Sequence, residues 1–326
     1  MRLSVIIPTF NQEAVLARHL SQTAAAAAAL GGGAEVLVVD DAGDHDGRAI
    51  EAVIGSVGPP VRLLRQRQHR GFAATCNAGA GACQGDLLLF LNSDIHCEPG
   101  SIEALAAVVE SNPNLFAAAP VLFNLRERFY ESTLRLRFHR GVFDVLQPGR
   151  SGAAPPPAGE LRPVAYACGG AFACRRRRFL DLGGFSTLLS PFYWEDADLG
   201  WRARCRGWAS AECGSARMLH DHGQTIQAFH KKRSILTIYE RNRLLFTWLH
   251  LQGGACWRTH LVWLPLRWVA ALVRGRPDSL ALPLALRRMA AVARERRRLR
   301  TCSAQAQGLI QQIRESGSAG WPQPTV

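Results

Sequence analysis

Short apolar segments alternate with helix-like segments through the first 115 residues, and this alternation restricts the possible folds more than any other feature of the chain. Four segments rich in β-branched and apolar residues have the length of strands: residues 3–7, 35–39, 61–64 and 86–91. The first and the last are typical of strands buried in a parallel sheet. Segments of helical composition follow them, at residues 13–30, 48–54, 72–82 and 101–111. Strands that alternate with helices form βαβ units. We therefore predict an α/β fold with a doubly wound, Rossmann-like and mostly parallel sheet.

The positive charge of the chain is concentrated in its last third. The 326 residues include 39 Lys and Arg and 26 Asp and Glu, a formal net charge of +13. Residues 231–326 hold 17 of the basic and 4 of the acidic residues, so the first 230 residues are balanced, with 22 of each. The last third also has a helical composition in which Arg, Trp and Leu dominate. We predict a basic, helical C-terminal extension, whose charge favours an anionic partner, either membrane lipid or nucleic acid.

Tryptophan and arginine in residues 244–273 are typical of a segment that lies in a membrane interface. A helix packed on the rest of the protein explains the same pattern equally well. Downstream, residues 287–300 are rich in arginine and suit a surface of anionic lipid. We expect residues 244–300 to bind an anionic membrane surface. The tryptophans of this segment are Trp248, Trp257, Trp263 and Trp268.

Several features bear on where the protein resides. The apolar run at residues 261–273 is interrupted by Pro265 and Arg267, whereas crossing a bilayer takes about 20 apolar residues, so no spanning helix is predicted. Residues 1–8 do not resemble a signal peptide. The nine cysteines include no C-x-x-C pair and are typical of free thiols in a reducing compartment. We expect a cytoplasmic protein that binds peripherally to the inner face of the cytoplasmic membrane.

Polar clusters follow three of the predicted strands. Thr9-Phe10-Asn11 follows the first strand, Asp40-Asp41 the second, and Asn92-Ser93-Asp94 the fourth. Ligands of open α/β sheets bind beyond the carboxyl ends of the strands. Each cluster alone is also compatible with a turn or a helix cap. Three clusters at one edge of a sheet favour a binding site.

Two further clusters carry groups suited to catalysis. In Trp194-Glu195-Asp196-Ala197-Asp198, three carboxylates lie within four residues, as in an acidic helix N-terminus or around a general base. In His220-Asp221-His222-Gly223, two imidazoles flank an aspartate, an arrangement suited to a metal or phosphate contact. No zinc-site spacing accompanies them, so Mg²⁺ or Mn²⁺ bridging substrate phosphates fits better than structural zinc.

Five motifs, in order along the chain, resemble family 2 glycosyltransferases of the GT-A fold, and within that family the bacterial rhamnosyltransferase-like branch. The likeness extends from about residue 3 to residue 250. The motifs are SVIIPTFNQ, VVDDAGDHD, HRGFAATCNAGAGACQGDLLLFLNSD, GGAFACRRRRFLDLGGF and FYWEDADLGWRARCRGW. The resemblance implies a catalytic domain in residues 1–230, with a nucleotide-binding half to about residue 115 and an acceptor-side half in residues 116–230, followed by the extension in residues 231–326.

The resemblance also implies an activity. The enzyme would be an inverting glycosyltransferase that moves a sugar from a nucleotide diphosphate sugar, with dTDP-rhamnose as the candidate donor, to a hydroxyl of a cell-surface glycan or a lipid-linked acceptor. Asp196 matches the family's general base. Asp94 closes the D-x-D motif that holds Mg²⁺ or Mn²⁺, and His220, in H-x-x-G-x-T, completes that metal site.

Further roles follow from the same likeness. Ten residues match positions that contact the nucleotide-sugar: Pro8, Thr9, Asn11, Asp40, Asp41, Arg70, Gly71, Asn77, Asn92 and Ser93. Three lie on the acceptor side: Trp194, Glu195 and Asp198.

One position departs from the family pattern. Asn92 stands where D-x-D begins, so the cation site has one carboxylate fewer, although the amide can still bond a sugar hydroxyl. A catalytically impaired nucleotide-sugar-binding protein is therefore an alternative. A nucleic-acid-binding protein acting through the arginine-rich tail is another, but it leaves the acidic and histidine clusters unexplained, and we expect no nucleic-acid partner. A nucleotidyltransferase would carry a Gly-rich loop where Thr9-Phe10-Asn11 stands.

Overall fold

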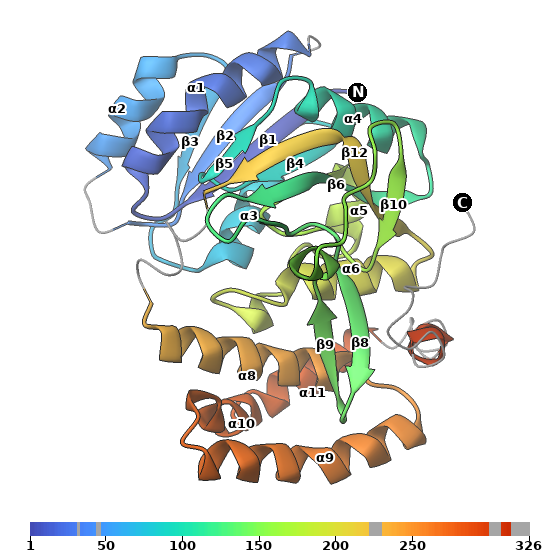
Figure 1. Cartoon of the computed structure of the whole chain (residues 1–326). Helices are drawn as coiled ribbons and strands as arrows, with labels where there is room; N and C mark the ends of the chain where they lie inside the picture. The colour runs from blue at the N-terminus through green and yellow to red at the C-terminus, as the bar shows by residue number, and fades with distance from the viewer. Residues whose placement is uncertain (31–32, 44–46, 222–229, 300–307, 314–326) are drawn as a thin grey trace.

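A β-sheet forms the centre of the first 220 residues (Figure 1). The computed structural model describes residues 1–30, 33–43, 47–221, 230–299 and 308–313. The sheet has the strand order β10-β12-β6-β11-β4-β1-β2-β3, with β5 paired to β12 and β7 to β6. Neighbouring strands among β1 to β4 are parallel, and β11 runs antiparallel between β4 and β6. The strands are β1 (Leu3–Thr9), β2 (Glu35–Asp40), β3 (Val61–Arg65), β4 (Leu87–Leu91), β5 (Ile95–Cys97), β6 (Leu115–Asn124), β7 (Phe129–Tyr130), β10 (Leu161–Val164), β11 (Ala171–Arg175) and β12 (Ala209–His220).

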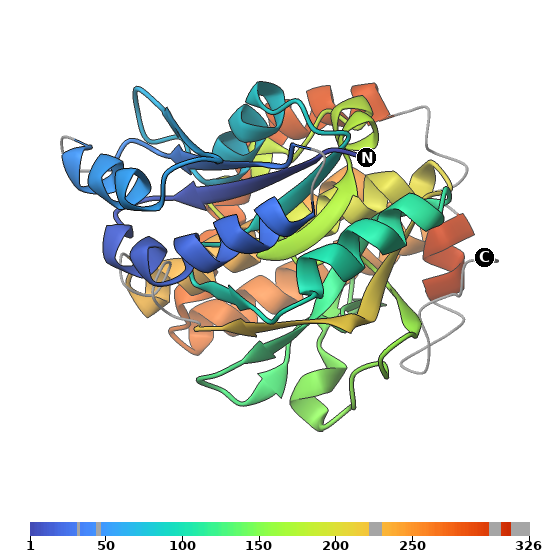
Figure 2. The ribbon, with the colours of Figure 1, turned by 90° about the horizontal axis from the view of Figure 1, so that it is seen from above.

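Helices cover both faces of this sheet, because successive side chains of a strand point to opposite sides. Leu3, Val5 and Ile7 pack with α1, α2 and α4, whereas Ile6 packs with α3, α5 and α6. Figure 2 shows α1 and α4 on one side of the sheet and α3 on the other. The arrangement confirms the predicted doubly wound, mostly parallel sheet. These helices are α1 (Glu13–Ala29), α2 (Arg48–Val57), α3 (Phe72–Ala82), α4 (Ser101–Ser111), α5 (Arg176–Asp181) and α6 (Glu195–Cys205).

The parallel strands end at one edge of the sheet. Thr9, the last residue of β1, pairs in register with Asp40, the last residue of β2. On the other side of β1, β4 ends at Leu91. The polar clusters that follow these three strands therefore lie along the same edge, as the sequence predicts.

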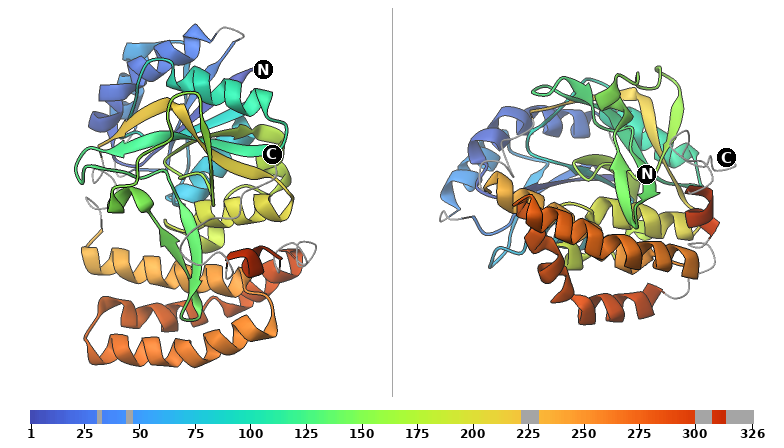
Figure 3. Two further views of the ribbon diagram at one scale, coloured as in Figure 1. Left: turned by 45° about the vertical axis from the view of Figure 1, so that its right-hand side comes forward. Right: turned by 60° about the horizontal axis from the view of Figure 1, so that its bottom comes forward.

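The C-terminal extension is helical, as predicted, and forms layers beside the sheet domain (Figures 1 and 3). A hairpin of β8 (Arg135–His139) and β9 (Val142–Leu146) reaches from the sheet domain to these helices. The first helix, α8 (Lys232–His250), contacts β9 and shares a hydrophobic core with α6. The following elements are α9 (Gly254–Val273), η3 (Pro277–Leu280), α10 (Ala281–Leu286) and α11 (Met289–Arg298).

Aromatic rings join the extension to the sheet domain. Phe246 of α8 contacts Phe143 of the hairpin, Trp194 and Trp201, with ring centroids 5.4, 5.0 and 5.9 Å apart. Most side chains of residues 244–251 are buried in this core. The expectation that the membrane-binding surface begins at residue 244 is therefore wrong, because these side chains are already buried within the protein. None of the helices in the described part of the chain combines the length and apolar character needed to cross a bilayer.

Candidate active site

Asp41 anchors the loop that follows β3 to the ends of β1 and β2. Its backbone N–H donates to the carbonyl oxygen of Thr9 at 2.9 Å. Its carboxylate accepts hydrogen bonds from the backbone N–H groups of Arg70 (2.8 Å) and Gly71 (2.7 Å) and from the side-chain amide of Gln66 (2.9 Å). Asp41, Arg70 and Gly71 are predicted to contact the nucleotide-sugar, and the structure brings these three residues together at the sheet edge.

Two other predicted nucleotide-sugar ligands use their side chains within the protein. The buried carboxylate of Asp40 lies 3.1 Å from Nε of Arg65, and burial raises its pKa. The side-chain amide of Asn77 donates to the carbonyl oxygen of Phe185 (2.9 Å) and accepts from its N–H (2.8 Å). A Cβ at Gly184 would lie 2.3 Å from Oδ1 of Asn77, so this turn requires glycine. These contacts give Asp40 and Asn77 structural roles, and their contact with the nucleotide-sugar stays a prediction.

A buried hydroxyl lies at the end of β1, where the loop to α1 begins. Oγ1 of Thr9 has no hydrogen-bond partner among the described residues. Next to it, the ring of Phe10 packs against His69, with ring centroids 4.3 Å apart, and Asn11 adopts a left-handed φ of 52°. Pro8 lies in β1 beneath this loop. Because a buried hydroxyl without a partner is costly, Thr9 is suited to a ligand contact.

Asn92, Ser93 and Asp94 form a tight turn after β4. The N–H of Asn92 donates to the carbonyl oxygen of Gly170 at 2.8 Å, and the N–H of Ile95 returns to the carbonyl oxygen of Asn92 at 3.2 Å. The hydroxyl of Ser93 donates to Oε1 of Gln12 at 2.7 Å, just before α1. Ser93 thus fixes the turn to the loop before α1. The side chain of Asn92 lies beside Gly170, and that of Asp94 lies beside His220.

Asp94 and His220 lie side by side, as predicted, and Glu131 joins them. Nε2 of His220 lies 3.4 Å from Oδ1 of Asp94, and Nδ1 lies 2.7 Å from Oε2 of Glu131. All three side chains are buried. Burial lowers the pKa of His220, but hydrogen bonds to the two carboxylates outweigh it and raise the pKa to about 10. The other motif residues, His222, Gly223 and Thr225, lie outside the described residues.

Asp196 occupies the first turn of α6. Its Oδ2 accepts a hydrogen bond from the N–H of Gly169 (3.0 Å), and its Oδ1 accepts one from the N–H of Ala197 (2.8 Å). Burial raises the pKa of Asp196, while these two N–H groups act in the opposite direction. Tyr193 and Trp194, just before the helix, have left-handed φ values of 71° and 75°. A sharp change in chain direction therefore sets the position of this carboxylate.

Gly169 and Gly170, just before β11, contact both the turn after β4 and the first turn of α6. A Cβ at Gly170 would lie 3.3 Å from Nδ2 of Asn92, and a Cβ at Gly169 would lie 3.3 Å from Cβ of Asp196. The side chains of Asn92 and Asp196 thus approach the same glycine pair. Hydrogen bonds and turn contacts link Asp94, Asn92 and Asp196 into one region at the carboxyl edge of the sheet.

The predicted acceptor-side residues divide into two groups. Nε1 of Trp194 and Oε2 of Glu195 are buried and have no hydrogen-bond partner among the described residues, and burial raises the pKa of Glu195 well above its usual range. In contrast, Asp198 lies 2.6 Å from Nη2 of Arg202 and 2.7 Å from Nε2 of His250. Asp198 therefore ties α6 to α8, and its contact with the acceptor stays a prediction.

The sequence reasoning missed three residues of this site. Gly169 and Gly170 belong to a quoted motif, GGAFAC, but the motif alone does not show that they touch Asn92 and Asp196. Glu131 has no local signal, because it is a lone glutamate between two short strands. Only the pairing of β6 with β7 and β12 brings it to His220.

Few donor groups are available for a metal. No group of three or more His, Cys, Asp or Glu side chains in the described ranges is arranged to hold a cation. Asp94 and His220 offer one carboxylate and one imidazole nitrogen. A donor set of this kind suits an ion that takes its remaining ligands from phosphate oxygens and water.

Comparison with known protein families establishes the family of this chain. The family model described as glycosyl transferase family 2 matches residues 4–180, more than half of the chain. The chain belongs to glycosyl transferase family 2. It is a glycosyltransferase, and the predicted family membership is confirmed.

Relatives in this family cover different shares of the chain. N-acetylglucosaminyl-diphospho-decaprenol L-rhamnosyltransferase of Mycobacterium tuberculosis (strain CDC 1551 / Oshkosh) is 28% identical over 319 residues, covering 91% of this chain and 96% of the relative. An uncharacterized glycosyltransferase of Haemophilus influenzae is 33% identical over 202 residues, covering 60% of each chain.

Solved glycosyltransferases share the fold. Residues 1–349 of S. aureus TarS align with a TM-score of 0.54 and 15% identity, covering 97% of this chain and 91% of that chain. Mannosyltransferase PcManGT of Pyrobaculum calidifontis, in complex with GDP-Man and Mn²⁺, aligns with a TM-score of 0.54 and 16% identity, covering 94% and 84%. GalNAc-T7 with UDP, GalNAc and Mn²⁺ aligns with a TM-score of 0.57 and 16% identity, covering 76% and 47%. The predicted GT-A fold is confirmed.

Proposed function

We propose that this glycosyltransferase transfers L-rhamnose, with inversion, from dTDP-rhamnose to a hydroxyl of a glycan carried on a polyprenyl diphosphate. The substrate classes are supported by the mycobacterial relative named as a rhamnosyltransferase of a lipid-linked acceptor, which matches this chain along nearly its whole length. An acceptor held in a bilayer also supports the expected location at the inner face of the cytoplasmic membrane.

The single observation that carries the reaction type is the position of Asp196. Its buried carboxylate adjoins the glycine pair that also contacts Asn92 at the end of β4. Asp196 lies in the first turn of α6, and the turn of Asn92 and Asp94, which we assign to the nucleotide-sugar and its cation, lies next to the same glycine pair. A base in this position suits attack on the sugar from the face opposite its leaving group. Asp94 and Thr9 belong to the donor side of this arrangement.

In the proposed reaction, Asp196 accepts the proton of the acceptor hydroxyl as that oxygen bonds to the anomeric carbon. The bond from the anomeric carbon to the diphosphate oxygen breaks, and its electron pair leaves with the nucleoside diphosphate. Because attack and departure take place on opposite faces, the anomeric configuration inverts. The N–H groups of Gly169 and Ala197 orient the carboxylate, and burial raises the pKa of Asp196 and makes it a stronger base.

Asp94 and His220 would hold a divalent cation, Mg²⁺ or Mn²⁺. The donor set fits once the Nε2 proton of His220 is released: Nδ1–H still donates to Glu131, and Nε2, 3.4 Å from Oδ1 of Asp94, would then offer its lone pair to the ion. When bound, the ion supplies positive charge to the diphosphate. Two solved neighbours contain Mn²⁺ together with a nucleotide or nucleotide-sugar. Asn92 adds no charge to this set and is assigned to a hydroxyl of the donor.

The test is product formation from purified components. The protein is incubated with dTDP-rhamnose, Mn²⁺ and a synthetic N-acetylglucosaminyl-diphospho-polyprenol, and release of dTDP and extension of the lipid are followed by chromatography. We expect both products in equal amounts. Binding of dTDP-rhamnose without release of dTDP would instead support the impaired, sugar-binding alternative. Transfer from another nucleotide-sugar in a donor panel would overturn the choice of rhamnose but not the reaction type.

A further inference from the structure

The outer face of the C-terminal helices is apolar although it faces solvent. Val262, Leu266, Val269 and Val273 recur every three or four residues along α9 and form one stripe, which we call the α9 stripe. Each of these side chains is at least 51% exposed. The opposite side of α9 packs inward through residues such as His260 and Ala271. Figures 1 and 3 show α9 as the outermost layer of the extension.

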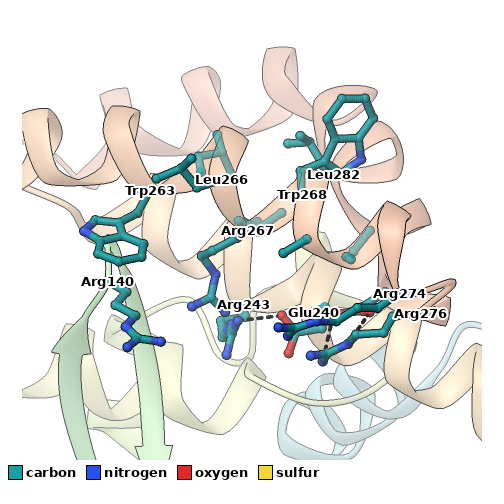
Figure 4. A pocket seen from close by; sticks show the side chains of 16 residues that line it. Arg140, Glu240, Arg243, Trp263, Leu266, Arg267, Trp268, Arg274, Arg276 and Leu282 are labelled. Carbon is teal, nitrogen blue, oxygen red and sulfur yellow. Dashed lines mark hydrogen bonds and ion pairs between the residues drawn. The ribbon is translucent and has the colours of Figure 1, made fainter.

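A basic pocket of about 310 Å³ lies beside this stripe, between α9, α8, η3 and the tip of the β8–β9 hairpin. Figure 4 shows Arg243 of α8 and Arg267 of α9 extending into the middle of the pocket, with Arg140 beside Trp263 at one end. The lining contains five arginines and two acids: Arg140, Arg243, Arg267, Arg274, Arg276, Glu240 and Asp278. Cations therefore exceed anions in the lining by three.

The acids of the pocket neutralise only part of this charge. Arg243 pairs with Glu240 (2.7 Å) and with Asp144 just outside the lining (3.0 Å), and Arg276 pairs with Asp278 (3.0 Å). Arg140 lies over the ring of Trp263, 5.2 Å from its centroid.

Two arginines of the lining remain. The guanidinium groups of Arg267 and Arg274 make no hydrogen bond or ion pair with any of the described residues. The pocket thus presents unneutralised guanidinium groups next to an exposed apolar stripe.

Guanidinium groups bind phosphate oxygens in a bidentate fashion, and tryptophan is favoured at the boundary between headgroups and acyl chains. We propose that this pocket binds the phosphate of an anionic membrane phospholipid while the α9 stripe enters the bilayer interface. The inference rests on the proposed membrane location but on neither the donor nor the acceptor.

Charge favours this occupant over a second copy of the chain. Pairing two α9 stripes would bring together two extensions that each carry an excess of basic residues. The apolar stripe, in turn, favours a phosphate attached to a lipid over a free phosphate ion, because a free ion would leave the stripe in water. The extension supplies both the charge and the apolar surface that an anionic bilayer requires.

The proposal is tested by sedimentation of the full-length protein with vesicles, without donor or acceptor. We expect binding to phosphatidylcholine vesicles that contain phosphatidylglycerol, and much weaker binding to phosphatidylcholine alone. The double variant Arg267→Gln/Arg274→Gln should weaken binding to the anionic vesicles about 25-fold, since each basic residue near such a surface contributes roughly a fivefold factor. Val262→Ser/Val269→Ser should also weaken binding. Arg177→Gln and Leu180→Ser, exposed on α5, are the matched controls and should bind as the parent does.

Several results would overturn the proposal. Equal binding to neutral and anionic vesicles would show that the pocket does not bind a lipid phosphate. Unchanged vesicle binding by the double arginine variant would show the same. Inorganic phosphate that competes with the vesicles at equal concentration would identify a small-anion site instead. A dimer in analytical ultracentrifugation that the stripe variant dissociates would assign the stripe to self-association. Circular dichroism checks folding, and if the double variant does not fold, Arg274→Gln alone is used, because Arg274 is exposed. Unchanged sugar transfer in solution by these variants separates this proposal from the proposed reaction.

Discussion

Nδ1 of His220 lies 2.7 Å from Oε2 of Glu131, so a glutamate that is remote in sequence sets the orientation of the imidazole. On the other side of the ring, Nε2 faces Asp94. This relationship gives Glu131 a positioning role at the proposed cation site, because a carboxylate bonded to one imidazole nitrogen fixes the direction in which the other nitrogen meets a metal.

We expect Glu131→Gln to weaken Mn²⁺ binding by 10- to 100-fold, the range typical of residues that orient a metal ligand. Calorimetric titration of Mn²⁺ in the presence of dTDP measures this directly, without turnover. Glu160→Gln, at an exposed position on another loop, is the control and should leave the titration unchanged. If Glu131→Gln binds Mn²⁺ as the parent does, the glutamate serves only the fold.

The glycine pair provides a second test of the site. Gly169→Ala would place a Cβ 3.3 Å from Cβ of Asp196, so the carboxylate must move by a few tenths of an ångström. Because small displacements of a catalytic group are costly, kcat should fall about tenfold or more while the donor KM changes little. Steady-state kinetics checks this split. Gly81→Ala, where a Cβ would meet nothing within 4 Å, should retain the parental kcat.

The ion network around Asp198 concerns stability rather than catalysis. Asp198→Asn leaves the buried guanidinium of Arg202 without its charge partner and should lower the free energy of unfolding by about 3–5 kcal/mol in urea titrations. Asp181→Asn removes an exposed contact to Arg177 and should cost less than about 1 kcal/mol. Equal stability of the two variants would contradict the structural role of Asp198.

The same network predicts a pH dependence of stability. Although burial opposes it, the charges and hydrogen bonds of Arg202 and His250 lower the pKa of Asp198 to about 2, below its ordinary value of about 3.9. A lowered folded-state pKa stabilises the fold above the ordinary value, and this stabilisation is lost as the pH falls from about 4 toward 2. Asp198→Asn should therefore show a smaller loss of stability over this acid range than the parent. Parallel pH profiles for the two proteins would refute the assignment.

Apolar runs made four of the ten strands of the sheet, β1 to β4, predictable. Strands β1, β2 and β4 match their predicted positions because their β-branched and leucine-rich sequences fit only strands buried on both faces. Strand β6 is different, because its sequence contains Pro120 and three consecutive alanines, which argue against a central strand. In the structure Pro120 lies beside Cys213, where the register between β6 and β12 shifts before Arg217, so an interruption of the ladder accommodates the proline.

The candidate site was predictable to the extent that its residues follow strands or stand in a motif. Asp41, Asp94 and His220 belong to such patterns. Asp198 stands in the same acidic motif as Asp196, and nothing local distinguishes them. Their surroundings differ because α8 brings His250 to Asp198, a contact that depends on how the extension packs and not on the motif.

The proposed proton transfer to Asp196 predicts how kcat/KM depends on pH in the acid range. A general base works only when deprotonated, and burial raises the pKa of both Asp196 and its neighbour Glu195. The value of kcat/KM should therefore fall with decreasing pH, with a midpoint above the ordinary value of about 3.9 for aspartate. Because the two carboxyl groups interact, the midpoint belongs to the pair. A flat profile down to the pH of unfolding would contradict a basic role for this carboxylate.

The most direct measurement is the turnover of Asp196→Asn alongside its affinity for the nucleotide. The asparagine keeps the size of the side chain but cannot accept the proton, so kcat should fall by about 10²- to 10⁴-fold. The dissociation constant for dTDP, measured by calorimetry, should match that of the parent and of the Asp181→Asn control. Turnover within a few-fold of the parent at unchanged nucleotide affinity would contradict the assignment of Asp196 as the base, and with it the proposed mechanism.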